Sequence, residues 1–493
     1  MYLLGYDCGT SLIKATLLDA ESGIQAASAT APAVEMQIRS LKPGWAEQSP
    51  EMWWDNLKNA TAELLSNSQI DPSQIKAIGI TYQMHGLVAV DKQLVPLRDS
   101  IIWCDSRSVD IGNRAFEGIG QKRCLQNLLN SPGNFTASKL KWVKDNEPEI
   151  YSRIYKAMLP GDYIAMKLTG EAYTTESGLS EMILWDFQKD RAAQSVLDYY
   201  GIDKELLPEA LPTFSMQGKL SGSAAAELGL AAGTKVCYRA GDQPNNAFSL
   251  NVLRPGEIAA TAGTSGVVYG VSDTPAYDRQ SRVNSFVHVN HQHSRPRYGV
   301  LLCINGAGIL NSWVKNNIAS GIDYAQIDKY ASEIPAGSEG LSIIPFGNGA
   351  ERILGNSWPD GAIRGINFHV HSQSHIFRAA QEGIAFAMNY GLSIMKNMNL
   401  KPQTIKAGNA NMFRSPVFCE AFSNVTGVTL ELYNTDGSQG AARAAGIGLG
   451  IYKNFEEAFQ GLECTKRIEP DQKLKQTYSE AYEKWIEILN KEE

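Results

Sequence analysis

Cysteine is scarce and scattered in this sequence. Its 493 residues include seven cysteines, at positions 8, 104, 124, 237, 303, 419 and 464, and no two of them form a C-x-x-C pair. An odd number of separated cysteines argues against a disulfide framework, and the missing pair argues against a cysteine-ligated zinc site. Reduced thiols are typical of the cytoplasm, so we expect a cytoplasmic protein.

Long apolar runs and an excess of positive charge are also absent. No run approaches the length of a membrane span, and Asp7 interrupts an apolar start that has no basic residues before it, so we expect neither a signal peptide nor a membrane partner. Asp and Glu outnumber Lys and Arg by 52 to 45, which gives a net charge of -7 and disfavours a nucleic-acid partner. The oligomeric state is open, with a homodimer as one candidate.

What the chain does have is a Gly-Thr-Ser phrase that occurs twice, each time between two β-like runs. The residues of the two phrases are Gly9, Thr10 and Ser11, and Gly263, Thr264 and Ser265. A glycine turn lets the backbone approach a ligand closely, and successive N–H groups form a concavity that binds anions. One copy alone would be read as an ordinary turn, but two copies predict a duplicated core whose hairpins hold nucleotide phosphates from both sides of a cleft.

The organisation along the chain predicts two α/β halves, residues 1–250 and 251–493, with a hinge at Arg254-Pro255-Gly256. In the first half we expect strands at 3–6, 13–18 and 77–81, a helix at 51–66 and a largely helical insertion at 126–176. In the second half we expect helices at 309–315 and 478–493, strands at 404–407 and 428–432, and an Ala-rich helix that begins near Ala441.

Asp242 is the candidate catalytic base. It follows Gly241 at the end of a predicted strand, where open α/β sheets place their ligands. Phosphoryl transfer to an alcohol needs one base to accept the hydroxyl proton, and the second phosphate hairpin lies just downstream. The alternative is a turn-forming aspartate. We assign Asp7, which precedes the first hairpin, to a magnesium ion, with water between them.

Two further phrases have the composition of a sugar pocket. Met84, His85 and Gly86 follow the strand at 77–81, where the histidine can hydrogen-bond a hydroxyl and Met84 can pack on a carbon face. Trp103 and Asp105, two residues before Arg107, supply an aromatic platform with an acid. The alternatives are a structural histidine, a tryptophan in the core and an Asp105–Arg107 ion pair at the surface.

Two groups of histidines could suggest a metal site. They are His288, His291 and His293, and His369, His371 and His375. No cysteine or acidic residue has ligand spacing to either group, so we expect both to be free of metal.

The ordered series of motifs resembles the FGGY carbohydrate kinases along nearly the whole chain. The series continues after the first hairpin and the Met-His-Gly triplet with Phe135–Val143, Gly241-Asp242-Gln243, the second hairpin, Gly349–Arg352 and Gly361–Gly383. The triplet indicates xylulose as the acceptor, because glycerol kinases carry an Arg-Glu-bearing phrase there. The chain departs from the family pattern at Asn134, Glu176, Gln381 and the loop that contains Gly408.

This resemblance implies two ribonuclease-H-like (actin-like ATPase) domains with ATP in the interdomain cleft. The family transfers the γ-phosphate of Mg-ATP to a sugar hydroxyl, which here gives D-xylulose 5-phosphate. It implies Asp242 as base, Asp7 as magnesium ligand, Met84 and His85 as sugar binders, and Gly306, Gly408 and Asn409 as nucleotide contacts. The rivals are a kinase for another ketose or polyol, such as ribulose or gluconate, and a non-catalytic nucleotide switch or sugar sensor.

Overall fold

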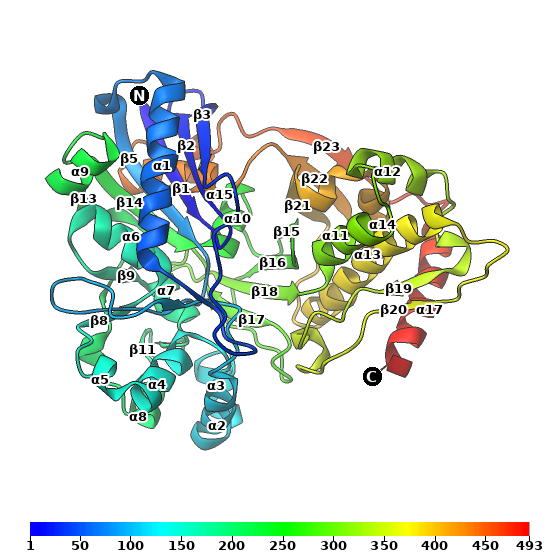
Figure 1. Cartoon of the computed structure of the whole chain (residues 1–493), viewed down its shortest axis with the longest axis horizontal. Coiled ribbons are helices and arrows are strands. Elements are labelled where there is room, and N and C mark those ends of the chain that lie inside the picture. Colours follow the sequence, from blue (N-terminus) through cyan, green and yellow to red (C-terminus); the bar gives the residue numbers. More distant parts are fainter. Residues whose placement is uncertain (493) are drawn as a thin grey trace.

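The structure is a computed structural model that describes residues 1–492, and it divides into two lobes (Figure 1). The strands of the N-terminal lobe are β1 (Tyr2–Cys8), β2 (Ile13–Asp19), β3 (Gln25–Ala31), β4 (Glu47–Gln48), β5 (Ile75–Tyr82), β6 (Val88–Val90), β7 (Ser100–Ile101), β8 (Lys156–Met158), β9 (Tyr173–Thr175), β10 (Trp185–Asp186), β11 (Arg191–Ala192), β12 (Glu209–Leu211), β13 (Phe214–Lys219) and β14 (Lys235–Gly241). Its helices are α1 (Pro50–Ser68), α2 (Val109–Ile119), α3 (Gln121–Asn127), α4 (Thr136–Asn146), α5 (Pro148–Tyr151), α6 (Pro160–Thr169), α7 (Glu176–Glu181), α8 (Gln194–Tyr200), α9 (Gly222–Leu228) and α10 (Asp242–Ser249).

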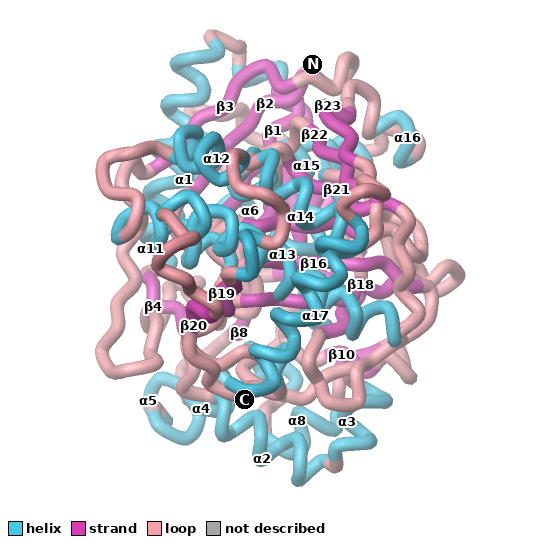
Figure 2. The backbone as a smooth tube through the Cα atoms, turned by 90° about the vertical axis from the view of Figure 1, so that its right-hand side faces the viewer, coloured by secondary structure: helices cyan, strands magenta, loops and turns pink. Residues whose placement is uncertain are grey.

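The C-terminal part of the chain forms most of the second lobe, whose helices face the viewer in Figure 2. Its strands are β15 (Ile258–Ala262), β16 (Gly266–Ser272), β17 (Asn284–Val287), β18 (Tyr298–Ile304), β19 (Ser342–Ile344), β20 (Ala362–Arg364), β21 (Thr404–Gly408), β22 (Thr429–Tyr433) and β23 (Cys464–Ile468). The helices are α11 (Ala307–Asn317), α12 (Tyr324–Ser332), α13 (Gln373–Asn397), α14 (Pro416–Thr426), α15 (Gly437–Gly448), α16 (Phe455–Ala458) and α17 (Lys475–Glu492).

The two large sheets repeat one arrangement. In the first, of order β13-β14-β5-β1-β2-β3, β1 pairs antiparallel with β2 and parallel with β5. In the second, of order β17-β18-β16-β15-β21-β22-β23, β15 pairs antiparallel with β16 and parallel with β21. The outer parallel strands β14 and β22 each carry one more antiparallel strand, β13 and β23. The duplicated core predicted from the twin Gly-Thr-Ser phrases is confirmed.

Most predicted elements are present at nearly their predicted positions. The strands expected at 3–6, 13–18, 77–81 and 404–407 lie within β1, β2, β5 and β21, and that at 428–432 overlaps β22. The helix expected at 51–66 is α1, and Ser415 caps α14 through its side chain, as the Ser-Pro pair indicates. The insertion at 126–176 contains α4, α5 and α6 but also the short strands β8 and β9. The terminal helix begins before the predicted residue 478, and residue 493 of that prediction lies outside the described residues.

Helix α15 leaves the second lobe and packs on β1, β5 and β14 of the first sheet. Gly5 and Gly79 are register partners in this sheet. A Cβ on Gly79 would lie 2.0 Å from the Ala441 carbonyl oxygen, and one on Gly5 would lie 1.9 Å from that of Ser438. The missing side chains therefore let the helix backbone touch the sheet. The sequence-based division near residue 250 does not foresee this return.

The hairpin of β17 and β18 extends the second sheet but is tied to the first lobe. Asn130 donates from Nδ2 to the Ser285 carbonyl at 2.7 Å, and the Ser285 amide donates back to Asn130 Oδ1 at 3.0 Å. Ser177 adds a bond from its hydroxyl to the Val287 carbonyl at 2.9 Å. This hairpin therefore connects the two lobes, and it cannot move relative to either one without breaking hydrogen bonds. Within residues 1–492, no helix combines the length and apolar character needed to cross a bilayer.

Candidate active site

The first Gly-Thr-Ser hairpin joins β1 to β2. The Gly9 amide closes the turn by donating to the Leu12 carbonyl at 3.1 Å. The Thr10 hydroxyl donates to Gln83 Oε1 at 3.1 Å and accepts from the Trp103 indole N–H at 3.0 Å. Thr10 therefore uses its side chain to fix the turn. Its carbonyl accepts from Gln48 Nε2 and that of Ser11 accepts from the Met36 amide, each at 2.8 Å, which leaves the Thr10 and Ser11 amides for a ligand.

The second hairpin joins β15 to β16, and its tip is hydrogen-bonded to the first turn of α11. The Gly263 carbonyl accepts from the Gly308 amide at 2.9 Å, and the Thr264 carbonyl from the Ile309 amide at 3.2 Å. A Cβ on Gly308 would lie 2.1 Å from the Gly263 carbonyl oxygen, so only glycine permits this approach. The hairpin tip and the first turn of the helix thus form one surface.

A cavity of about 560 Å³ opens beside this second hairpin, within the size range of small-molecule sites. Gly263 and Thr264 line it together with the first turn of α11 and residues 410–412, 414 and 415. Of the predicted nucleotide contacts, Gly306 stands at the N-cap of α11, Gly408 ends β21 and Asn409 follows it. These three do not line the cavity, whereas their neighbours Gly308, Ala410 and Asn411 do.

Asp242 is the first residue of α10 and directly follows β14, as predicted. Burial raises the pKa of Asp242 to about 6. Burial also raises the pKa of Asp7 to about 7, with added repulsion from Asp242 and Asp436 and partial relief from Lys14. Lys14 Nζ lies 2.6 Å from Asp436 Oδ2, at the N-cap of α15. Three carboxyl groups from three chain segments are therefore brought together at the base of the first hairpin.

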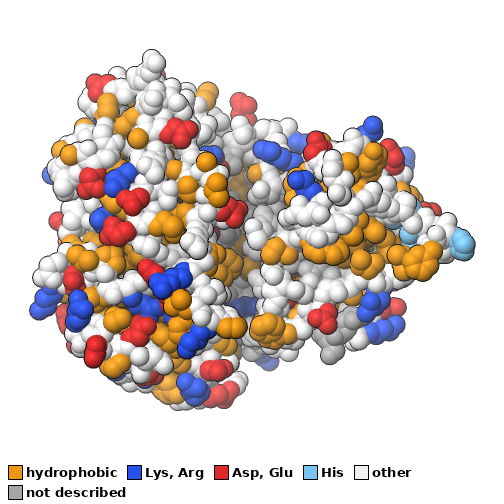
Figure 3. All heavy atoms as spheres, viewed as in Figure 1, with side chains coloured by type: hydrophobic (Ala, Val, Ile, Leu, Met, Phe, Trp, Pro, Cys, Tyr) orange, Lys and Arg blue, Asp and Glu red, His pale blue; other side chains and the backbone are white. Residues whose placement is uncertain are grey.

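Asp242 also faces the second hairpin. Burial raises the pKa of Cys303 to about 11, with contributions from Glu351 and Asp242, while a hydrogen bond with the Ser265 side chain opposes the rise. Cys303 pairs with Val267 at the base of this hairpin. The candidate base thus lies electrostatically close to Asp7 on one side and to the Ser265 end of the second hairpin on the other. The molecular surface is hollowed between the lobes (Figure 3).

Met84 and His85 lie next to this base. A Cβ on Gly241 would lie 2.6 Å from Met84 Cγ and 2.7 Å from Glu181 Oε2. His85 has a left-handed backbone (φ 60°), and its amide donates to Glu181 Oε1 at 3.2 Å. Burial lowers the pKa of His85 to about 3, so the imidazole is neutral, and its Nδ1 lies 3.1 Å from the Glu181 carbonyl oxygen.

Two aromatic rings hold the imidazole of His85. Phe135 meets it edge-on at 4.7 Å between centroids, and Phe286 of β17 lies at 5.4 Å. Lys139, which is fully buried in α4, donates from Nζ to the carbonyls of His85 and Ile102 at 2.8 and 3.0 Å. Burial lowers the pKa of Lys139 to about 7.

Trp103 and Asp105 occupy different environments. Trp103 is 41% exposed beside Thr10, so it is not the core anchor of the alternative interpretation. Asp105 is 0% exposed, and its Oδ2 accepts from the Ala46 amide at 2.6 Å and from Arg107 Nη2 at 2.7 Å. The Asp105–Arg107 pair exists but is buried, which corrects its expected surface position. Gly86 packs so closely that a Cβ would lie 2.7 Å from Pro160 Cγ.

Sequence reasoning missed several residues of the site. Glu181 is buried, and burial raises its pKa well above the usual range. Asp436 stands at the N-cap of α15, and neither its approach to Lys14 nor the contacts of Asn130 have a signal in the local sequence. The one available signal for Glu181 is an acid within a stretch that is otherwise apolar or small.

Two family models cover the chain. That for the N-terminal domain of the FGGY family of carbohydrate kinases matches residues 2–249, and that for the C-terminal domain matches residues 258–449. The chain belongs to the FGGY family of carbohydrate kinases. The actin-like ATPase fold predicted from the resemblance is therefore confirmed, and the chain is a sugar phosphotransferase, not a non-catalytic switch.

Relatives of this FGGY kinase span almost its full length. It is 28% identical to the xylulose kinase of Bacillus subtilis, over 92% of this chain and 90% of the relative. It is 28% identical to that of Lactococcus lactis, over 99% and 96%. The xylulose kinase structure from Rhodospirillum rubrum superimposes with a TM-score of 0.87 at 25% identity, covering 100% of this chain and 99% of that one. A gluconate kinase from Lactobacillus acidophilus shares the fold, with a TM-score of 0.89 at 24% identity over 99% and 97%.

Proposed function

We propose that this FGGY kinase transfers the γ-phosphate of ATP to D-xylulose, giving D-xylulose 5-phosphate and ADP. The observation that carries the proposal is the position of Asp242: it begins α10, which contacts β15 and β16 of the second hairpin, it repels Asp7 at the base of the first hairpin, and it follows Gly241, which packs against Met84. The names of the full-length relatives favour D-xylulose over other acceptors.

Asp242 acts as general base in this proposal. With a pKa of about 6 it is ionised at neutral pH, yet basic enough to accept the proton of the terminal sugar hydroxyl. The freed oxygen forms a bond to the γ-phosphorus while the bond from phosphorus to the bridging oxygen of ADP breaks. The proton stays on Asp242 until solvent removes it.

The acidic cluster fits a magnesium ion. Asp7 supplies carboxylate oxygens, which are the ligands that hard cations prefer, and the repulsion from Asp242 and Asp436 that raises the pKa of Asp7 would be relieved by a cation. When bound, Mg²⁺ neutralises charge on the phosphates. Asp7 would hold it, with water between them.

The nucleotide and the sugar would enter from opposite sides of Asp242. The cavity beside the second hairpin accepts the nucleoside, Gly306, Gly408 and Asn409 support its wall, and the amides of both hairpin tips bind the phosphates. On the sugar side, the neutral His85 ring, with Nδ1 at the Glu181 carbonyl, presents Nε2 as an acceptor for a hydroxyl. Trp103 stands at the rim, and Asp105 holds the loop beneath it through Arg107. Closure about residues 254–256 would expel water and limit hydrolysis of ATP.

A panel of acceptors in a coupled ADP assay tests the proposal. We expect kcat/KM with D-xylulose to exceed that with L-xylulose, D-ribulose, D-gluconate and glycerol by about 10-fold or more, since one well-placed hydrogen bond discriminates at that level. A higher value with another acceptor would overturn the specificity. ADP release that no sugar stimulates would overturn the reaction.

A further inference from the structure

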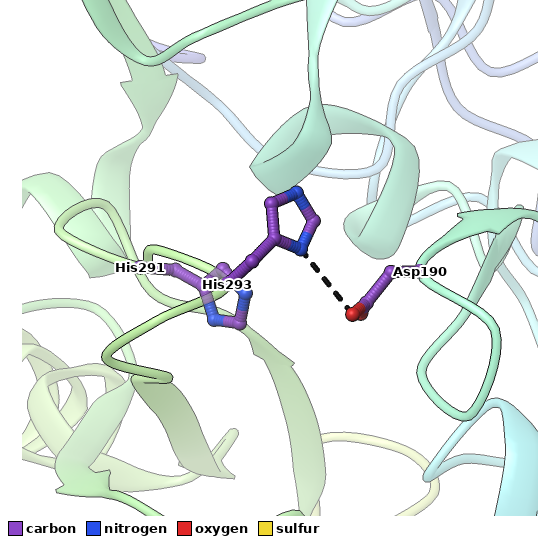
Figure 4. Close-up of side chains that lie close together, drawn as sticks. All are labelled: Asp190, His291 and His293. Carbon is purple, nitrogen blue, oxygen red and sulfur yellow. Dashed lines mark ion pairs between the residues drawn. The ribbon is translucent and has the colours of Figure 1, made fainter.

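A cluster of histidine and carboxylate side chains lies outside the catalytic cleft, where the two lobes meet (Figure 4). His291 and His293 belong to the loop between β17 and β18, and Asp190 to the turn between β10 and β11. One potential ligand atom of each of these three residues lies within 4.8 Å of the others. From the sequence we expect these histidines to be free of metal, because no acidic residue lies at ligand spacing from them. Asp190 lies about a hundred positions upstream of both, and only the fold brings it close.

His293 is oriented by carboxylates on both sides of its ring. Its Nδ1 lies 3.2 Å from Asp190 Oδ2, and its Nε2 lies 3.4 Å from Glu176 Oε1. Glu176 is one of the positions at which the chain departs from the family pattern. An imidazole that donates one N–H to a carboxylate has its other nitrogen fixed as a metal ligand.

His291 has one nitrogen engaged and one buried without a partner. Its Nδ1 faces both backbone groups of Arg297: it lies 3.0 Å from the carbonyl oxygen, to which it donates when protonated, and 3.2 Å from the amide, from which it accepts when it is not. Its Nε2 is shielded from solvent and has no hydrogen-bond partner within residues 1–492. The tautomer that donates Nδ1–H to the carbonyl leaves a lone pair on Nε2, which is the state that binds metals.

We propose that Asp190 Oδ2, His291 Nε2 and His293 Nδ1 bind a divalent transition metal ion of the zinc class, with water as the fourth ligand. Ion pairs with Asp190 and Glu176 would explain the position of the His293 ring, but they leave His291 Nε2 buried without a partner. A bound metal ion explains the positions of both histidines. Imidazole with carboxylate favours Zn²⁺ over Mg²⁺, so this site is distinct from the acidic cluster of the reaction.

The neighbouring histidine does not join the site. His288 Nδ1 contacts the Tyr269 hydroxyl at 3.1 Å and its Nε2 contacts the Val252 carbonyl at 3.2 Å, so both nitrogens are engaged elsewhere. The proposed ligands come from both lobes, so the metal would fix the β17–β18 loop to the first lobe beside the bonds of Asn130 and Ser177.

Equilibrium dialysis with Zn²⁺ tests the proposal, on the full chain stripped with a chelator and without nucleotide. We expect about one Zn²⁺ per chain, a loss of this binding in His291→Ala, His293→Ala and Asp190→Asn, and an affinity about 10- to 100-fold lower in Glu176→Gln. The matched control is His369→Ala, an exposed histidine outside the cluster, which should bind as the parent does. Co²⁺ in place of Zn²⁺ should give the visible absorption of a tetrahedral site, absent in Asp190→Asn.

Two results would overturn the proposal. One is a parent protein that retains no Zn²⁺. The other is equal binding by the parent and the three ligand variants, which would indicate adventitious surface histidines. Circular dichroism of each variant separates a lost ligand from a lost fold, and Asp190→Asn, isosteric and exposed, keeps the test valid if a histidine variant unfolds.

Discussion

Buried acids that repel one another distinguish the residues of the cleft. Burial raises the pKa of Asp242 to about 6 and, with Asp242 and Asp436 nearby, that of Asp7 to about 7. Such an arrangement costs folding free energy and is typical of sites that bind a cation or move a proton.

Replacing Asp242 by Asn keeps the shape of the side chain but removes the base. We expect kcat to fall about 10²- to 10⁴-fold while the affinity for ATP changes little, because the base acts only on the sugar proton. Steady-state kinetics and nucleotide titration measure the two effects. Asp110→Asn, an exposed acid on α2, is the control, and equal turnover by Asp242→Asn and the parent would remove Asp242 from the reaction.

The same carboxyl group predicts a pH dependence. Since Asp242 must be ionised to accept a proton and its pKa is about 6, kcat/KM should fall as the pH drops through about 6. A pH–rate profile measures it when it runs from about pH 5, one unit below this pKa, to about pH 9, where the group is fully ionised. A profile that stays flat down to pH 5 would contradict the assignment.

Removing the charge of Asp7 should stabilise the fold. Its pKa is about 7 in the folded chain, above the ordinary value of 3.8, so the folded state binds the proton more tightly. The charged group therefore destabilises the fold as the pH rises from about 4 to above 7. Asp7→Asn should therefore raise Tm by a few degrees at pH 8, but little at pH 4.5, while activity falls. Thermal unfolding at both pH values without Mg²⁺ measures this, and a lower Tm at pH 8 would count against the electrostatic account.

At the scale of elements, the docking of α15 depends on two glycines. Gly79→Ala places a Cβ about where the Ala441 carbonyl lies, so we expect a loss of about 1–3 kcal/mol in the free energy of unfolding. The matched control is Gly222→Ala, where a Cβ would have no atom within 4 Å. Chemical denaturation measures both, and equal stability of the two variants would show that α15 does not need the glycine.

The sequence predicts the helices and strands better than it predicts which of them pack together. The turns at Gly9 and Gly263 stand between β-branched or apolar runs, so the hairpins are visible in local sequence. The contact of α15 with Gly79 joins residues far apart in the chain. Arg107, the partner of Asp105, likewise packs over the rings of Trp45 and Trp142, which lie far from it in the sequence. Local pattern carries no information on such contacts. The approach of Asp190 to His293 was missed for the same reason.

On the scale of the whole molecule, the proposed sugar side of the site is built from both lobes. His85 of the first lobe packs against Phe286 of β17, which pairs with β18 of the second sheet. Phe286→Ala should raise KM for the sugar several-fold through loss of the packing that positions His85, with KM for ATP as the internal control. A variant whose two KM values both match those of the parent would show that β17 does not shape the sugar site.

The return of α15 also bears on how the chain is made. The face of the first sheet that carries Gly5 and Gly79 is covered by residues 437–448. During synthesis that face stays uncovered until residues 437–448 have also left the ribosome. The first sheet is therefore completed only after most of the second lobe has been translated, and apolar surface exposed in that interval is prone to aggregation.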